Sequence, residues 1–296
     1  MKELDAVPVL THVARLGEGP VWDERAEVLW WIDWYGAGVF RSRLQDDETE
    51  VFSVGDAIAA VALSDGDAVW VAMGHGFFEL DPTTGRVREV GRAEPSGDLT
   101  RMNDGKCDAT GRFWAGTMSL DGHSPIGALY ALQADGSVRR VLDGVINSNG
   151  MCWSADNKTA YYVDSGTQRI DAFDYDLAEG NLTNRRVVKE FRREEGTPDG
   201  LTIDAEGYLW VALWDGWQVR RYSTDGELDC VIPFPVARPT CCTFAGEDFR
   251  DLLITTAMPD SVEERADQPL AGRVFRARAD TPGLPAYRRE LSRIER

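Results

Sequence analysis

A segment of similar pattern recurs six times along the chain, at intervals of 40 to 49 residues. In each copy an acidic or polar turn leads into an apolar strand, and five of the six strands carry an aromatic anchor residue. A repeat of this length identifies a supersecondary unit that stacks against its neighbours, so it constrains the fold more than any other feature of the chain. The six anchors are Trp30, Trp70, Trp114, Tyr161, Trp210 and Leu253.

Each copy continues with a second strand of alternating polar and apolar residues, as in GVFRSRL from Gly38 and GALYAL from Gly127. Four of these second strands are followed by a turn that contains glycine. Short alternating strands separated by such turns are typical of antiparallel hairpins. Six units of about four strands each, with no long segment of helical periodicity, predict an all-β fold, a six-bladed β-propeller with four antiparallel strands per blade.

No linker or low-complexity stretch divides the chain, so we expect a single propeller domain over residues 1–296. The even spacing of the repeat argues against the structural alternative, a pair of β domains. We expect the segment Val7–Val13, which precedes the first unit, to pair with the last unit and close the ring. The blades are expected to begin near Glu18, Asp56, Asp98, Val145, Pro198 and Arg238.

The formal charge of −18 argues against nucleic acid and anionic membranes as partners, since both would be repelled. The longest unbroken apolar run, Val28–Ile32, is far too short to span a bilayer. No basic region followed by an apolar stretch is present at the N-terminus, which favours a cytoplasmic location. Five cysteines without a C-x-x-C pair fit the same compartment. We expect a monomer or a weak homodimer.

The first strand of each propeller blade lines the central channel, so equivalent positions at its start converge. Eleven or twelve residues before four of the anchors lie polar, oxygen-bearing side chains, in the local sequences EGP, NDG, SNG and PDG. Two carboxylates and two amides directed at one point suit a hard or borderline divalent cation. These four residues are Glu18, Asn103, Asn149 and Asp199.

The alternative for any one of these positions is an ordinary turn, because Asn-Gly and Asp-Gly are common turn dipeptides. Four such positions in register favour a shared site instead. No G-x-S-x-G, H-E-x-x-H or P-loop sequence offers a competing catalytic motif. Trp214 and Trp217 follow a predicted strand into a loop, where they could flank a ligand.

The chain resembles the regucalcin/gluconolactonase family, also called the senescence marker protein family. The resemblance extends over essentially the whole chain, and it rests on several motifs together. They are LGEGPVW from Leu16, RMNDGKCDATGRFWAGTM from Arg101, SNGMCWSAD from Ser148, DAFDYDLAEGNLTNRR from Asp171, TPDGLTIDAEGYLWVA from Thr197 and PTCCTFAG from Pro239.

This resemblance implies a divalent ion bound by Glu18, Asn149 and Asp199, and a substrate held by Arg101 and Asn103. In animal members an acidic residue of the following loop also contacts the substrate, and Asp121 is the only acid in the shorter loop of this chain. The common activity of the family is hydrolysis of aldonolactones, so the expected partner is a small sugar lactone.

The chemistry expected of such a site is ester hydrolysis. A cation that polarises the lactone carbonyl would stabilise the developing oxyanion. Asp199 would act as the catalytic base towards water. Two alternatives stay open, an organophosphate or other ester hydrolase on the same scaffold and a calcium-binding regulatory protein without catalysis. The oxygen donors accept Ca²⁺, Mg²⁺, Mn²⁺, Fe²⁺ or Zn²⁺, so the sequence leaves the metal and the sugar open.

Overall fold

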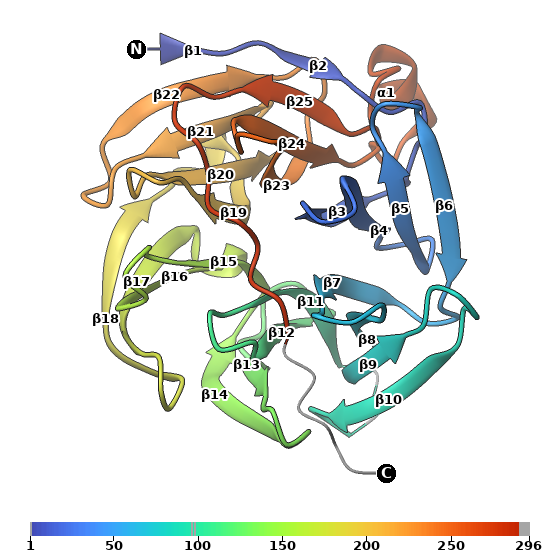
Figure 1. Cartoon of the computed structure of the whole chain (residues 1–296). Helices are drawn as coiled ribbons and strands as arrows, with labels where there is room; N and C mark the ends of the chain where they lie inside the picture. The colour runs from blue at the N-terminus through green and yellow to red at the C-terminus, as the bar shows by residue number, and fades with distance from the viewer. Residues whose placement is uncertain (1, 96, 98, 290–296) are drawn as a thin grey trace.

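Six blades, each built on four antiparallel strands and one of them extended by a fifth strand, surround a central channel in the computed structural model, which describes residues 2–95, 97 and 99–289 (Figure 1). This arrangement confirms the predicted six-bladed β-propeller. The innermost strands start within three residues of the expected blade starts wherever the comparison can be made. Asp98, the expected start of the third blade, lies outside the described residues, as do the ends of the expected 1–296 domain.

The first three blades follow one another along the chain. Blade one contains β3 (Gly17–Asp23), β4 (Val28–Asp33), β5 (Gly38–Arg43) and β6 (Glu48–Ser53). Blade two contains β7 (Ile58–Leu63), β8 (Val69–Met73), β9 (Gly76–Leu80) and β10 (Val87–Arg92). Blade three contains β11 (Thr100–Cys107), β12 (Phe113–Ser119), β13 (Gly127–Leu132) and β14 (Val138–Val145).

Of the remaining blades, five and six include strands from the N-terminus. Blade four contains β15 (Ser148–Trp153), β16 (Thr159–Asp164), β17 (Arg169–Asp176) and β18 (Asn181–Glu190). Blade five contains β19 (Thr197–Ile203), β20 (Leu209–Trp214), β21 (Gln218–Tyr222), β22 (Leu228–Pro233) and β1 (Lys2–Glu3). Blade six contains β23 (Pro239–Ala245), β24 (Asp251–Thr256), β25 (Phe275–Arg278) and β2 (Ala6–Pro8).

Among the residues that the structure describes, helical structure is confined to three short elements. They are the 3₁₀ turns η1 (Ser165–Thr167) and η2 (Arg193–Glu195) and the helix α1 (Val262–Asp267). Within the described residues, no helix is long and apolar enough to cross a lipid bilayer.

The ring is closed by the N-terminal segment, as predicted. Strand β2 forms the outer strand of blade six by pairing antiparallel with β25, with Val7 opposite Arg276. Strand β1 continues past this closure and pairs in parallel with β22, which gives blade five its fifth strand. The sequence did not indicate this second contact.

All six anchor residues of the repeat are buried, and they pack between neighbouring blades. Trp114 of blade three, for example, packs against Met151 and Trp153 of blade four. The acidic turn that precedes an anchor also has a structural role in two blades. The indole Nε1 of Trp114 donates to Asp108 at 2.8 Å, and blade five repeats this bond between Trp210 and Asp204.

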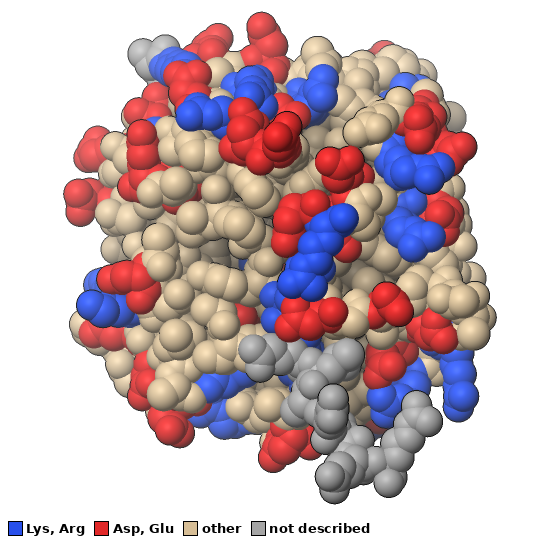
Figure 2. Space-filling model, viewed as in Figure 1, with Lys and Arg blue, Asp and Glu red and all other residues tan. Residues whose placement is uncertain are grey.

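The C-terminal segment 282–289 runs across one end of the channel (Figure 1). Figure 2 views this face and shows acidic and basic side chains interspersed over it. The segment forms hydrogen bonds with every blade, so it connects the whole ring. Its partners, from blade one to blade six, are Asp23, Leu63, Leu132, Asn157, Ala205 and Phe249.

Candidate active site

A cavity of about 340 Å³ lies at one end of the channel, and four side chains predicted from the repeat register line it. Each comes from the innermost strand of a different blade, from β3, β11, β15 and β19. The expected convergence of these side chains is therefore present in the structure, whereas their roles as ligands or substrate contacts stay predictions. They are Glu18, Asn103, Asn149 and Asp199.

A β-bulge directs these side chains towards the channel. All six innermost strands shift register near their start, for example between Glu18 and Val21 and between Ser148 and Met151. A bulge bends its strand and changes the direction of a side chain, which explains why polar residues at this point face the axis.

The glycine that follows the polar residue has a packing role in blades four and five. A Cβ atom on Gly150 would clash with the backbone of Leu201 in the next blade. A Cβ atom on Gly200 would likewise clash with the side chain of Cys241. The recurring Asn-Gly and Asp-Gly pairs are thus required by the close approach of neighbouring innermost strands.

Two carboxylates that line the cavity are buried, Glu18 and Asp199. They are 7% and 6% exposed. Burial raises the pKa of Glu18 well above its ordinary value, and the charges of Asp199 and Asp104 raise it further. Burial and the charge of Asp104 also raise the pKa of Asp199, while Asn149 partly offsets this rise. No basic side chain among the described residues lowers either pKa, so the pair favours a bound cation.

Asn149 presents an amide oxygen to the same cavity. Its Nδ2 donates to Ser165 Oγ at 3.0 Å, and this hydroxyl donates to the carbonyl oxygen of Pro198 at 2.7 Å. These bonds fix the amide, yet its Oδ1 is buried without a hydrogen-bond donor among the described residues. A buried acceptor without a partner is costly, so Oδ1 is free to coordinate a cation.

Asn103 and Arg101 both belong to β11, the innermost strand of blade three. Asn103 donates from Nδ2 to the carbonyl oxygen of Ser148 at 2.7 Å, and it lines the cavity. The guanidinium of Arg101 stacks on Trp34 at 3.4 Å and donates to the carbonyl oxygen of Ile58 at 2.9 Å. Burial lowers the pKa of Arg101 to about 10. Arg101 is not among the residues that line the cavity, and it contacts the lining through Trp34.

Asp121 lies elsewhere, in the loop between β12 and β13. Its side chain is 41% exposed and accepts hydrogen bonds from Ser119 Oγ at 2.6 Å and from the backbone N–H of His123 at 2.9 Å. These hydrogen bonds and those from Ser124 lower the pKa of Asp121. Asp121 is absent from the residues that line the cavity, and its contact with substrate stays a prediction.

Most other lining residues were not found from the sequence. Leu16, Trp34, Tyr35, Met118, Asn147, Ser165, Thr197 and Trp214 complete the wall. Only Trp214 had a sequence signal, its place between a strand and a loop. The guanidinium of Arg238 lies over the ring of Trp214, 4.6 Å from its centroid. Arg238 Nε in turn donates to Asp215 Oδ1 at 2.8 Å. Trp217, which the sequence also suggested could flank a ligand, is 46% exposed and does not line the cavity.

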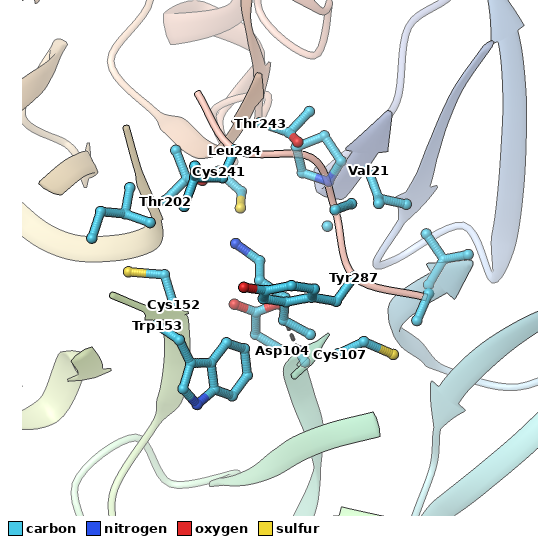
Figure 3. A pocket seen from close by; sticks show the side chains of 18 of the residues that line it. Val21, Asp104, Cys107, Cys152, Trp153, Thr202, Cys241, Thr243, Leu284 and Tyr287 are labelled. Atoms are coloured by element: carbon cyan, nitrogen blue, oxygen red, sulfur yellow. Dashed lines mark hydrogen bonds between the residues drawn. The ribbon is translucent and has the colours of Figure 1, made fainter. Parts of the chain in front are cut away.

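The channel continues past the site towards the C-terminal segment. Figure 3 shows Asp104, Cys241 and Tyr287 around this second cavity, with Leu284 and Tyr287 on the segment that crosses it. Lys106 donates from Nζ to the carbonyl oxygen of Leu201 at 2.8 Å. Burial raises the pKa of Asp104 to about 6, and the charge of Lys106 opposes the rise.

The described residues contain no group of three or more His, Cys, Asp or Glu side chains that could hold a metal ion. The expected ligand set has a different composition, because it combines two carboxylates, Glu18 and Asp199, with the amide of Asn149. The burial and mutual repulsion of the two carboxylates, together with the unpaired Oδ1 of Asn149, are the features of this set that favour a bound cation.

These features define a six-bladed β-propeller with a polar cavity built by the innermost strands of four blades. The chain belongs to the SMP-30/Gluconolactonase/LRE-like family, whose model matches residues 16–258. It is 35% identical over 282 residues to YvrE of Bacillus subtilis, which is named as a sugar lactone lactonase, with 95% of this chain and 97% of that protein covered.

Regucalcin of Gallus gallus is 37% identical over 281 residues, covering 92% of this chain and 94% of that protein. Among solved structures, a regucalcin from Agrobacterium tumefaciens, described as a calcium-binding protein, superimposes with a TM-score of 0.92 at 26% identity. That superposition covers 98% of this chain and 99% of the other.

Proposed function

We propose that the protein hydrolyses a sugar lactone to the aldonic acid and depends on one divalent cation held by Glu18, Asn149 and Asp199. The observation that carries this proposal is the pair of buried carboxylates beside the unpaired Oδ1 of Asn149. The names of the family and of the related lactonase support the same reaction class.

The donor set fits a cation of this kind. Carboxylate and amide oxygens suit Ca²⁺, Mg²⁺ and Mn²⁺, and they also accept Fe²⁺ or Zn²⁺. Three protein oxygens leave coordination positions for water and substrate. The calcium-binding description of the Agrobacterium relative agrees with a hard cation.

A divalent cation bound here would supply a Lewis acid that polarises the lactone carbonyl and stabilises negative charge on its oxygen. Asp199 would accept a proton from the attacking water as the water oxygen bonds to the carbonyl carbon. The C–O bond to the ring oxygen then breaks, and Asp199 returns the proton to that oxygen. Burial makes its carboxylate more basic than an exposed aspartate, while a nearby cation acts in the opposite direction.

Substrate positioning falls to Asn103 and Arg101. The amide of Asn103 is held by Ser148, and the guanidinium of Arg101 is held against Trp34, so both groups are oriented before substrate arrives. Such preorganisation fixes the carbonyl relative to the attacking water without further ordering at the moment of reaction.

The lining of the cavity favours a sugar over an aryl ester. The polar side chains of Asn147, Ser165 and Thr197 line the same cavity as the rings of Trp34 and Trp214. Polar groups of this kind bind ring hydroxyls, and aromatic faces pack against the C–H groups of a sugar. A cavity of about 340 Å³ also exceeds what an ion alone requires, which counts against a purely calcium-binding role.

The deciding experiment is hydrolysis of a substrate panel by protein stripped with a chelator and then reloaded with Ca²⁺, Mg²⁺, Mn²⁺, Fe²⁺ or Zn²⁺. The panel contains aldonolactones, unsubstituted δ-valerolactone, an aryl acetate and an organophosphate triester. We expect metal-dependent turnover that is fastest on aldonolactones, followed with a pH indicator. Preference for the aryl acetate or the triester, or no turnover with any metal, would contradict the proposal.

A further inference from the structure

Side-chain amide oxygens without a hydrogen-bond partner gather in one part of the molecule. Three buried ones occur among the described residues, and all belong to blade four or the connection that leads into it. Two of these oxygens belong to residues that line the cavity. The third belongs to a glutamine whose Nε2 donates to the hydroxyl of Thr197, which also lines the cavity. These three residues are Asn147, Asn149 and Gln168.

Asn147 stands out because the proposed cation does not account for it. It lies two residues before Asn149, and both side chains line the same cavity. Asn149 supplies the expected metal ligand, whereas the amide oxygen of Asn147 has no assigned partner.

The backbone of Asn147 is held on both sides. Its N–H donates to Asp164 Oδ1 at 2.9 Å, and its carbonyl oxygen accepts from the N–H of Ser165 at 3.0 Å. The N–H of Ile146 donates to the other oxygen of Asp164 at 3.1 Å. A backbone fixed in this way presents its side chain in a defined position, as a recognition group requires.

The chemistry of the unpaired atom defines what it can bind. An amide oxygen is an acceptor only, so its complement in a ligand is an O–H or N–H donor. A sugar lactone carries several hydroxyl donors on its ring, whereas an unsubstituted lactone carries none. A buried acceptor that lacks a partner in the free protein gains a hydrogen bond only from a ligand that supplies the donor, so it favours the hydroxylated ligand over its deoxy analogue.

We propose that Asn147 determines substrate specificity by accepting a hydrogen bond from one ring hydroxyl of the lactone through its Oδ1. This inference rests on the proposed lactonase function, and it adds the group by which the cavity distinguishes a hydroxylated lactone from its deoxy analogue.

The test combines Asn147→Leu, which has a similar shape but no acceptor, with substrates that lack single hydroxyls. kcat/KM is measured for wild type and variant on the best aldonolactone of the panel and on each of its monodeoxy derivatives. The variant should lose roughly ten- to hundredfold on the parent lactone. On one monodeoxy lactone, wild type and variant should be equal, because the hydrogen bond is then absent from both.

A matched control is Asn181→Leu, which makes the same substitution at an exposed position of β18, outside the cavity lining. It should change neither parent nor deoxy kinetics. An equal loss on the parent and on every deoxy lactone would show that Asn147 is merely structural. Loss of bound metal in Asn147→Leu would make it a metal ligand, and this too would overturn the proposal.

Binding provides a readout that does not need turnover. 1,5-Anhydro-D-glucitol has a hydroxylated ring and cannot be hydrolysed, so calorimetric titration can compare wild type with Asn147→Leu even if no lactone is a substrate. We expect weaker binding to the variant, and equal binding would contradict the inference. Absence of lactone turnover with intact discrimination between the two proteins would instead refute only the proposed reaction.

Discussion

At the scale of single residues, Asp199 carries two proposed roles, metal ligand and base. Asp199→Asn keeps an oxygen donor of the same size but cannot accept a proton at neutral pH. Bound metal should therefore remain, while turnover falls by roughly 10²-fold, the usual effect of losing a positioned base. Metal content by mass spectrometry and lactonase kcat at saturating metal test this. Near wild-type turnover would leave Asp199 as a ligand only.

The buried carboxylates also predict how stability depends on pH. Burial raises the pKa of Asp104 to about 6, above the value of about 3.9 in an unfolded chain. Between these values the folded protein binds more protons than the unfolded one, so stability falls as pH rises. In chelator, Asp104→Asn should gain stability relative to wild type from pH 4 to 6, by roughly 2–3 kcal/mol, and then hold that gain. Urea unfolding across this range measures it, and a constant difference would contradict the assignment.

At the scale of the structural element, the innermost strands depend on glycine where neighbouring blades approach. Gly200→Ala places a Cβ atom against Cys241 and should cost roughly 1–3 kcal/mol of unfolding free energy. Gly97 is the matched control, because nothing lies within 4 Å of a Cβ atom there. Gly97→Ala should be neutral or slightly stabilising, since it restricts the unfolded chain. Similar urea midpoints for both variants would show that close strand packing does not explain the repeated glycine.

At the scale of the whole molecule, the segment 282–289 joins all six blades. Arg289 is only 2% exposed, donates to the carbonyl oxygens of Leu132 and Gln133, and stacks on Trp70 at 4.5 Å. Arg289→Ala should destabilise the protein by about 2–4 kcal/mol, because buried carbonyls lose charged donors. Arg25→Ala, which removes an exposed ion pair, should change stability by less than about 1 kcal/mol. Equal unfolding midpoints would mean that the segment merely covers the channel.

The sequence by itself determined the propeller and much of its site. Blade number follows from local signals, namely alternating strands, turn residues and an anchor that recurs at a near-constant interval. The same register placed Glu18, Asn103, Asn149 and Asp199 at equivalent positions, and a ring of similar blades brings equivalent positions together. Their convergence could therefore be predicted without knowing any contact between blades.

The tertiary structure alone decided the features that depend on distant segments. Trp34 and Asn147 line the cavity because of how loops from different blades meet, and neither stands at the repeated position. The course of 282–289 across the channel and the pairing of β1 with blade five depend on backbone bonds between segments far apart in the chain. No local pattern encodes such contacts, because they form only when the closed ring brings their partners within reach.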